Sequence, residues 1–115
     1  MPSFNTAARI QKPGKPLMVI AGRTLTYGEQ WSRCHALNDW VQKLDLLPDT
    51  PILLAVRDEF EQSSLLLALI ILGKPPLIFD PHATPSEAAV ILGSSDFGAI
   101  IADEAVQKCW KLDDY

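Results

Sequence analysis

Three short apolar runs, separated by helix-like segments, constrain the fold of this chain most strongly. They are residues 51–56 (PILLAV), 75–79 (PPLIF) and 98–102 (GAIIA). None of them alternates between apolar and polar side chains, which is typical of strands covered on both faces of a parallel sheet. Helix signals follow each run, so strand and helix recur in the order that builds right-handed βαβ crossovers. The pattern predicts an α/β fold, a three-layer βαβ sandwich with a mainly parallel sheet.

The segment before the first run predicts a small hairpin and one amphipathic helix. Residues 17–20 and 23–26 are extended runs joined by Ala21-Gly22, which favours a tight turn. Thr26 and Glu29 form a T-x-x-E capping box, so we expect a helix that begins at Tyr27. Apolar residues then recur every three or four positions, and this helix is predicted to end near residues 46–48.

Three further helices are predicted after the three apolar runs. Their expected limits are Phe60 to a C-terminal Gly73, Thr84-Pro85 to Gly93, and Asp103 to Trp110. The helix over residues 60–72 is apolar on every side between Leu65 and Leu72. Packing against the sheet on one side would leave apolar side chains of this helix exposed on the other. The helix is therefore expected to be sandwiched or to face a partner.

Length and composition narrow the class of protein. A chain of 115 residues with 48% hydrophobic residues predicts one globular domain, residues 1–115. The formal net charge is −4 and no basic stripe is present, so nucleic acid is not an expected partner. Residues 1–15 lack the features of a secretion signal, and the longest apolar run falls short of the roughly 18 residues that a membrane span needs. We therefore expect a cytoplasmic protein without a membrane partner.

Polar residues at the predicted carboxyl ends of two strands are the first candidates for a site. Ligands of open α/β sheets bind at these ends, where the sequence places Asp58, Glu59, Asp80 and His82. If the strands are neighbours, these side chains can form a metal or acid–base cluster. Alternatively, the carboxylates cap helices and turns, which is the interpretation that the sequence favours.

The remaining candidates indicate structure more strongly than chemistry. His35 and Asp39 are spaced as one helix turn, without a third group or a nucleophile. The tryptophans lack interleaved basic residues and are expected in the core or an interface, and the two cysteines are expected as reduced thiols (Trp31, Trp40, Trp110, Cys34 and Cys109). Motifs for a phosphate loop, a dinucleotide fold, a serine hydrolase and a zinc protease are missing from the sequence. No catalytic, cofactor-binding or metal site is therefore predicted within this chain.

Three stretches in order resemble the adenylate-forming superfamily, which contains the AMP-dependent acyl-CoA synthetases and adenylation domains. Residues 22–29 (GRTLTYGE) are similar to its first core motif, G-x-x-L-T-Y-x-E-L. Residues 71–87 (ILGKPPLIFDPHATPSE) resemble its second motif, although Ile78 stands where the family usually has proline. Residues 53–60 resemble the strand and loop between them, with Arg57 and Asp58 in place of the usual asparagine region. The resemblance extends from about Ala8 to Ala102.

This resemblance implies that the chain corresponds to the first N-terminal subdomain of a longer AMP-forming acyl or aryl acid ligase. Such enzymes make an acyl-adenylate from a carboxylic acid and MgATP, and many then load coenzyme A or the phosphopantetheine of a carrier protein. The phosphate loop, the acidic Mg/ATP region, the ribose-binding aspartate and the catalytic lysine of the family have no counterpart before Tyr115. ATP, Mg and coenzyme A or phosphopantetheine are therefore implied for the complete enzyme and not for this chain alone.

Three hypotheses follow for function. The first is a structural portion of an acyl-adenylate-forming ligase, partnered by the remainder of the enzyme or a companion polypeptide. The second is a stand-alone interaction or oligomerisation module derived from such an enzyme, which self-associates through the apolar helix 60–72. The third is a small flavodoxin-like ligand-binding domain that uses the strand ends at Asp58 and Asp80.

Overall fold

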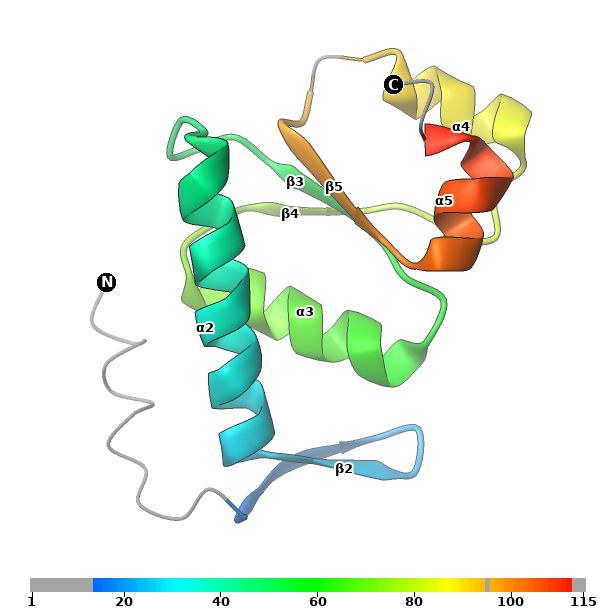
Figure 1. The fold of residues 1–115 in the computed structure, drawn as a ribbon. Coiled ribbons are helices and arrows are strands. Elements are labelled where there is room, and N and C mark those ends of the chain that lie inside the picture. Colours follow the sequence, from blue (N-terminus) through cyan, green and yellow to red (C-terminus); the bar gives the residue numbers. More distant parts are fainter. Residues whose placement is uncertain (1–13, 95, 113–115) are drawn as a thin grey trace.

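The chain forms a three-stranded parallel sheet between helices, with a two-stranded hairpin beside it (Figure 1). The computed structural model describes residues 14–94 and 96–112. The predicted α/β class with its mainly parallel sheet and N-terminal hairpin is confirmed. The elements are β1 (Pro16–Ile20), β2 (Arg23–Thr26), α2 (Tyr27–Leu44), β3 (Ile52–Ala55), α3 (Glu59–Ile71), β4 (Pro76–Ile78), α4 (Pro85–Leu92), β5 (Ala99–Ala102) and α5 (Glu104–Trp110).

The strand order of the parallel sheet is β4-β3-β5. Ile52 at the start of β3 pairs with Pro76 on one side and with Ala99 on the other. All four residues of β3 are buried, because this central strand has a neighbour on each side and helices on both faces. The apolar run without alternation therefore predicted the position of this strand correctly.

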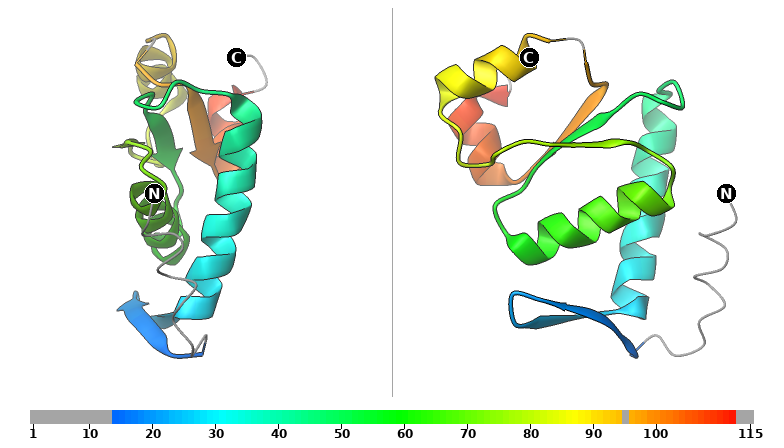
Figure 2. Two further views of the ribbon diagram at one scale, coloured as in Figure 1. Left: turned by 90° about the vertical axis from the view of Figure 1, so that its left-hand side faces the viewer. Right: turned by 180° about the vertical axis from the view of Figure 1, so that it is seen from behind.

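Helices cover both faces of the sheet, which gives the predicted three layers. The step from β3 to β4 and the step from β4 to β5 run in opposite directions across the sheet. Right-handed crossovers in opposite directions place α3 and α4 on opposite faces. Figure 2 shows this arrangement, with α2 and α3 on one side of the strands and α4 and α5 on the other.

Each layer of helices has its own hydrophobic core. The first core lies between α2, α3 and the sheet and contains Cys34, Leu37, Val41, Ile52, Ala68, Leu69 and Leu72. The second core lies between α4, α5 and the other face and contains Ala55, Ala83, Ala88, Val106 and Trp110. The two cores are small, so loss of one large side chain removes a substantial part of either.

The helix boundaries agree with the capping signals in the sequence. The Thr26 and Thr84 hydroxyls each accept the backbone N–H three residues ahead at 3.2 Å, and Glu29 and Glu87 in turn accept the N–H of the capping threonine at 3.1 Å. Gly73 has φ 73°, the left-handed conformation expected after α3. The end of α2 differs from the prediction, because Asp45 at φ 51° ends the helix before residues 46–48.

Replacement of Thr84 by alanine is expected to reduce the free energy of unfolding by about 1 kcal/mol, because α4 then begins with an unsatisfied backbone N–H. Urea denaturation followed by circular dichroism measures this loss. The variant Thr84→Ser keeps the hydroxyl acceptor and serves as the control, with a change below about 0.5 kcal/mol. Equal losses in the two variants would contradict a capping role.

The hairpin packs against the first layer of helices. Its turn places Ala21 at φ 50° and Gly22 at φ 77°, the paired positive values of a tight turn between antiparallel strands. Leu25 of β2 is only 1% exposed. The Arg23 guanidinium lies 4.0 Å from the centre of the Phe60 ring at the start of α3. The hairpin therefore contributes a buried residue, Leu25, to the fold.

None of the helices in the described part of the chain has the combined length and hydropathy that crossing a bilayer requires. Most of the N-terminal segment on which the expectation about a secretion signal depends, residues 1–13, lies outside the described residues.

Candidate functional site

The candidate residues at the carboxyl ends of β3 and β4 take the structural role that the sequence favoured. The two strands are neighbours, so the condition for a cluster is met. However, Asp58 Oδ1 accepts the N–H groups of Phe60 at 2.9 Å and Glu61 at 3.1 Å, which caps α3. Asp80 Oδ1 accepts the His82 N–H at 2.8 Å and closes a turn. Within residues 14–94 and 96–112, no three metal-ligating side chains gather into a possible site.

A hydrogen-bonded ion pair joins the carboxyl ends of β3 and β5. The Asp103 carboxylate accepts the Arg57 N–H at 2.8 Å and the Val106 N–H at 3.0 Å, and it lies 3.4 Å from Arg57 Nε. Burial alone raises the pKa of Asp103, but the two backbone N–H groups and the Arg57 guanidinium outweigh it and lower this pKa below its ordinary value. Asp103 thus caps α5 and holds the two strand ends together.

The lowered pKa of Asp103 predicts a contribution to acid unfolding. A carboxyl whose pKa is lower in the folded state stabilises the fold above its ordinary pKa of about 4, and this stabilisation disappears as the pH falls through the lowered value. The variant Asp103→Asn keeps a capping side chain but removes the charge. We expect its free energy of unfolding to fall less steeply than that of the parent chain below pH 5, as measured by urea denaturation at several pH values. Parallel curves for the two proteins would contradict this role.

A small cavity of about 310 Å³ lies beside the carboxyl ends of β3 and β4. Its lining includes Ile20 from the hairpin, Arg57 and Glu59 after β3, and His82 after β4. The charge of Arg57 is already paired with Asp103. The cavity therefore has the position of a ligand site in an α/β sheet but not the donor set of a phosphate cradle.

The segment of the second resembled motif ties β4 to the last helix. The Phe79 ring meets the Trp110 ring edge to face, with 5.6 Å between their centres. Trp110 Nε1 donates to the Ala83 carbonyl at 2.9 Å, and Trp110 is 3% exposed. This motif is therefore scaffold in the structure, because its aromatic and backbone groups are used to build the second core.

A buried polar pair between α2 and α3 was not predicted. Gln30 Nε2 donates to the Ser64 carbonyl at 3.0 Å, and the Ser64 hydroxyl donates to Gln30 Oε1 at 2.5 Å. Both residues are buried, and Gln30 Nε2 also lies 3.7 Å from Cys34 Sγ. Burial raises the pKa of the Cys34 thiol. The only signal in the sequence was a glutamine on the apolar stripe of α2.

The remaining candidates from the sequence lie on α2 and α5. The His35 ring lies edge to face with Trp31, at 4.1 Å between centres. Cys34 and Cys109 are free thiols, as expected, although Cys109 is exposed and Cys34 buried. Trp40 packs against the first core.

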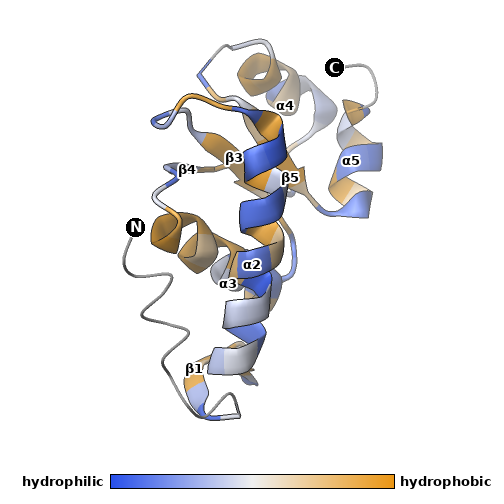
Figure 3. Ribbon diagram, turned by 60° about the vertical axis from the view of Figure 1, so that its left-hand side comes forward, coloured by the Kyte–Doolittle hydropathy of each residue, from blue (hydrophilic) through white to orange (hydrophobic). Residues whose placement is uncertain are grey.

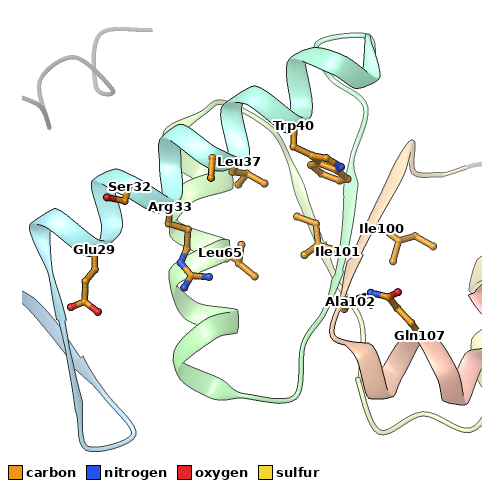
Figure 4. Close-up of a pocket in the computed structure, with 11 residues that line it drawn as sticks. Glu29, Ser32, Arg33, Leu37, Trp40, Leu65, Ile100, Ile101, Ala102 and Gln107 are labelled. Carbon is orange, nitrogen blue, oxygen red and sulfur yellow. Dashed lines mark hydrogen bonds between the residues drawn. The ribbon is translucent and has the colours of Figure 1, made fainter.

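An open groove runs along β5, and we call it the β5 groove. It has a volume of about 800 Å³ and runs between α2 and α5. Figure 4 shows Leu37 and Trp40 of α2 on one side, the strand residues Ile100 and Ile101 in the middle, and Gln107 of α5 on the other side. Leu65, from the helix expected to be sandwiched or to face a partner, also lines it. The groove is mainly apolar, so its chemistry favours docking of polypeptide over catalysis.

Three polar side chains on the wall of the β5 groove already have partners, namely Arg33, Gln107 and Glu29. Arg33 forms an ion pair with Glu61. Gln107 Nε2 donates to the Ala102 carbonyl at 2.6 Å. Glu29 belongs to the capping box of α2, and the bonds from the Thr26 N–H and hydroxyl lower its pKa. These groups therefore frame the groove without offering a nucleophile or an acid–base pair.

Comparison with known proteins gives a consistent result. The model of the family described as AMP-binding enzyme matches residues 4–114. A benzoate CoA ligase from Burkholderia xenovorans LB400 has a TM-score of 0.73 and 22% identity over 98% of this chain and 24% of its own. The N-terminal subdomain of Klebsiella oxytoca NpsA, in complex with 3-hydroxybenzoyl-AMSN, has a TM-score of 0.65 and 17% identity over 94% and 31%. MatB from Rhodopseudomonas palustris has a TM-score of 0.70 and 16% identity over 96% and 22%.

A comparison with curated protein sequences gives no match. The chain spans about a quarter of the benzoate CoA ligase and about a third of the NpsA subdomain chain. At these identities, the solved structures show a shared fold. Since the family model matches almost the whole length, the chain belongs to the AMP-binding enzyme family.

Proposed function

We propose that this chain is the N-terminal structural portion of an AMP-forming carboxylic acid ligase, with the catalytic residues on the remaining polypeptide. The complete enzyme would join an acid to AMP and pass the acyl group to coenzyme A or to a carrier-protein thiol. The observation that carries the proposal is the combination of a family match over residues 4–114 with coverage of only 24% of a benzoate CoA ligase.

The chemistry of adenylation supports this division. Transfer of AMP to a carboxylate needs cationic and N–H donors on the developing phosphoryl charge, with the acid held in line. In the described residues, the arginines near the strand ends are paired, Arg57 with Asp103 and Arg23 with Asp58. The side chains present do not fit MgATP, so we assign ATP, Mg and coenzyme A or phosphopantetheine to the remaining polypeptide.

The partner in this proposal is the remaining part of the enzyme, in the same chain or as a companion polypeptide. Neither nucleic acid nor a membrane is an expected partner, given the formal net charge of −4. We place the enzyme in the cytoplasm, where the free thiols of Cys34 and Cys109 stay reduced.

Two alternatives have specific support. The cavity of about 310 Å³ beside Arg57 and His82 favours a small ligand-binding domain. Ile70 on α3, which is 58% exposed, favours a self-associating module. Figure 3 shows that α3 is mostly hydrophobic, whereas α2 carries a hydrophilic stripe.

Titration of the purified chain with MgATP, coenzyme A and flavin mononucleotide separates the proposal from the ligand-binding alternative. Isothermal calorimetry is expected to give no saturable heat with any of them up to millimolar concentration. Stoichiometric binding at micromolar concentration would favour the ligand-binding domain instead.

Sedimentation of the variant Ile70→Asp tests self-association, because a dimer built on α3 would dissociate in that variant.

A further inference from the structure

Gln30 of α2 and Ser64 of α3 form a closed pair of hydrogen bonds inside the first layer of helices. Gln30 Nε2 donates to the Ser64 carbonyl at 3.0 Å, and the Ser64 hydroxyl donates to Gln30 Oε1 at 2.5 Å. Because the Ser64 carbonyl can only accept, it fixes which end of the Gln30 amide faces α3. Gln30 is 4% exposed and Ser64 is completely buried. Water therefore offers neither side chain a replacement partner when the other is lost.

Hydrophobic burial does not explain why this pair lies in the core. Ser64 and Ala68, which are four residues apart on one face of α3, are completely buried. The three leucines between them, residues 65–67, are only half-buried. A rotation of α3 by roughly 100° about its axis, which is one residue of a helix, would bring a leucine to the contact with α2. Helices pack at spacings from about 8 to 10 Å according to the side chains between them, so α2 can accommodate the larger residue.

Gln30 is also a departure from the motif that its segment resembles. The pattern G-x-x-L-T-Y-x-E-L ends on leucine, whereas residues 22–30 (GRTLTYGEQ) end on glutamine. A leucine of similar size would fit this position without a polar partner on α3. The two polar residues therefore occur together at a contact that apolar side chains could fill.

A second polar link between the two helices lies beside the pair. Arg33, three residues after Gln30, forms an ion pair with Glu61, three residues before Ser64. The side chains of this ion pair are partly exposed, and such pairs contribute little to stability. The ion pair agrees with the observed orientation of α3, but the buried pair depends on that orientation more strongly because its groups have no access to water.

We propose that the Gln30–Ser64 pair is a packing selector, which fixes the single orientation in which α3 lies against α2. In this orientation each polar atom of the two side chains has a partner. A turned α3 would bury the Gln30 amide against leucine without a partner. The selected orientation places Leu65 on the wall of the β5 groove and leaves Ile70 exposed. The inference goes beyond the proposed function and holds whether the chain acts alone or within a larger enzyme.

A packing selector has a characteristic effect on stability, because removing half of the pair costs more than removing all of it. Ser64→Ala leaves Gln30 Oε1 buried without a donor, so we expect the unfolding equilibrium constant to rise at least about tenfold. Gln30→Leu is expected to have a smaller effect, since the serine hydroxyl can donate to a carbonyl one turn earlier in its own helix. The double variant Gln30→Leu/Ser64→Ala has an apolar contact instead and is expected to lie within about threefold of the parent chain or to be more stable.

Urea denaturation of the full chain measures these constants. Ser63→Ala is the matched control, because it makes the same change at a neighbouring serine that is only half-buried. Its unfolding equilibrium constant is expected to stay within about twofold of the parent value.

The number of packings is read from the amide NMR spectrum of the isotope-labelled chain. The parent is expected to give one sharp signal for each amide of residues 65–71, and so is the Ser63→Ala control. In the double variant, signals of these amides are expected to split into more than one set or to broaden, because a core that keeps its volume without its specifying contacts loses uniqueness before stability.

Two results would overturn the proposal. A folded double variant that keeps one sharp signal for each of these amides would show that apolar packing alone fixes the orientation of α3. A double variant that is more destabilised than Ser64→Ala would show that the pair holds the helices together and does not select between packings. This second result includes a double variant that does not fold.

Discussion

Replacement of Trp110 by alanine is expected to lower the free energy of unfolding by about 4 kcal/mol, the middle of the range for a buried aromatic residue. Trp110 is 3% exposed, packs on Phe79 and donates to the Ala83 carbonyl at 2.9 Å. The alanine variant loses the ring contacts and leaves that carbonyl without its donor. Urea denaturation followed by circular dichroism gives the value.

The variant Trp110→Phe is the matched control for this prediction. Phenylalanine keeps an aromatic ring beside Phe79 but has no N–H for Ala83, so we expect a loss of about 1 to 2 kcal/mol. A loss below about 1 kcal/mol for the alanine variant would show that the second core does not depend on Trp110. The link between the β4 loop and α5 would then need another explanation.

A second large effect is expected for Leu69→Ala in α3. Leu69 is fully buried in the first core, and its truncation is expected to cost about 3 kcal/mol through lost burial and the cavity left behind. Its neighbour Ile70 is 58% exposed, so Ile70→Ala is expected to cost less than about 0.5 kcal/mol. Chemical denaturation of the two variants at one protein concentration compares them directly.

This pair also shows what the apolar helix does. A large loss for Leu69→Ala with a small one for Ile70→Ala means that one face of α3 is core and the other is free. A large loss for Ile70→Ala that depends on protein concentration would instead indicate an interface built on this helix. The second result would favour the self-associating module over the structural portion of a larger enzyme.

The sequence predicted the elements of the fold well, because their signals are local. The capping boxes at Thr26 and Thr84 and the left-handed Gly73 depend on residues within one helix turn, and all three appear in the structure. The lack of alternation around Ile52 predicted a buried strand, because burial on both faces leaves no polar positions.

The candidate site was less predictable, because it depends on contacts between distant residues. The pairing of Gln30 with Ser64 and that of Arg57 with Asp103 join residues 34 and 46 positions apart. The order of the strands, which places β5 at one edge of the sheet among residues 14–94 and 96–112, also has no signature in any single segment.

The central claim is that this chain is one structural part of an acyl-adenylate-forming enzyme. The most direct measurement is acid-dependent exchange of pyrophosphate into ATP, with benzoate as the acid. It compares this chain alone, the Burkholderia xenovorans ligase lacking the matched segment, and the two together. We predict no exchange from either piece and exchange above background from the mixture. Exchange by this chain alone would contradict the account.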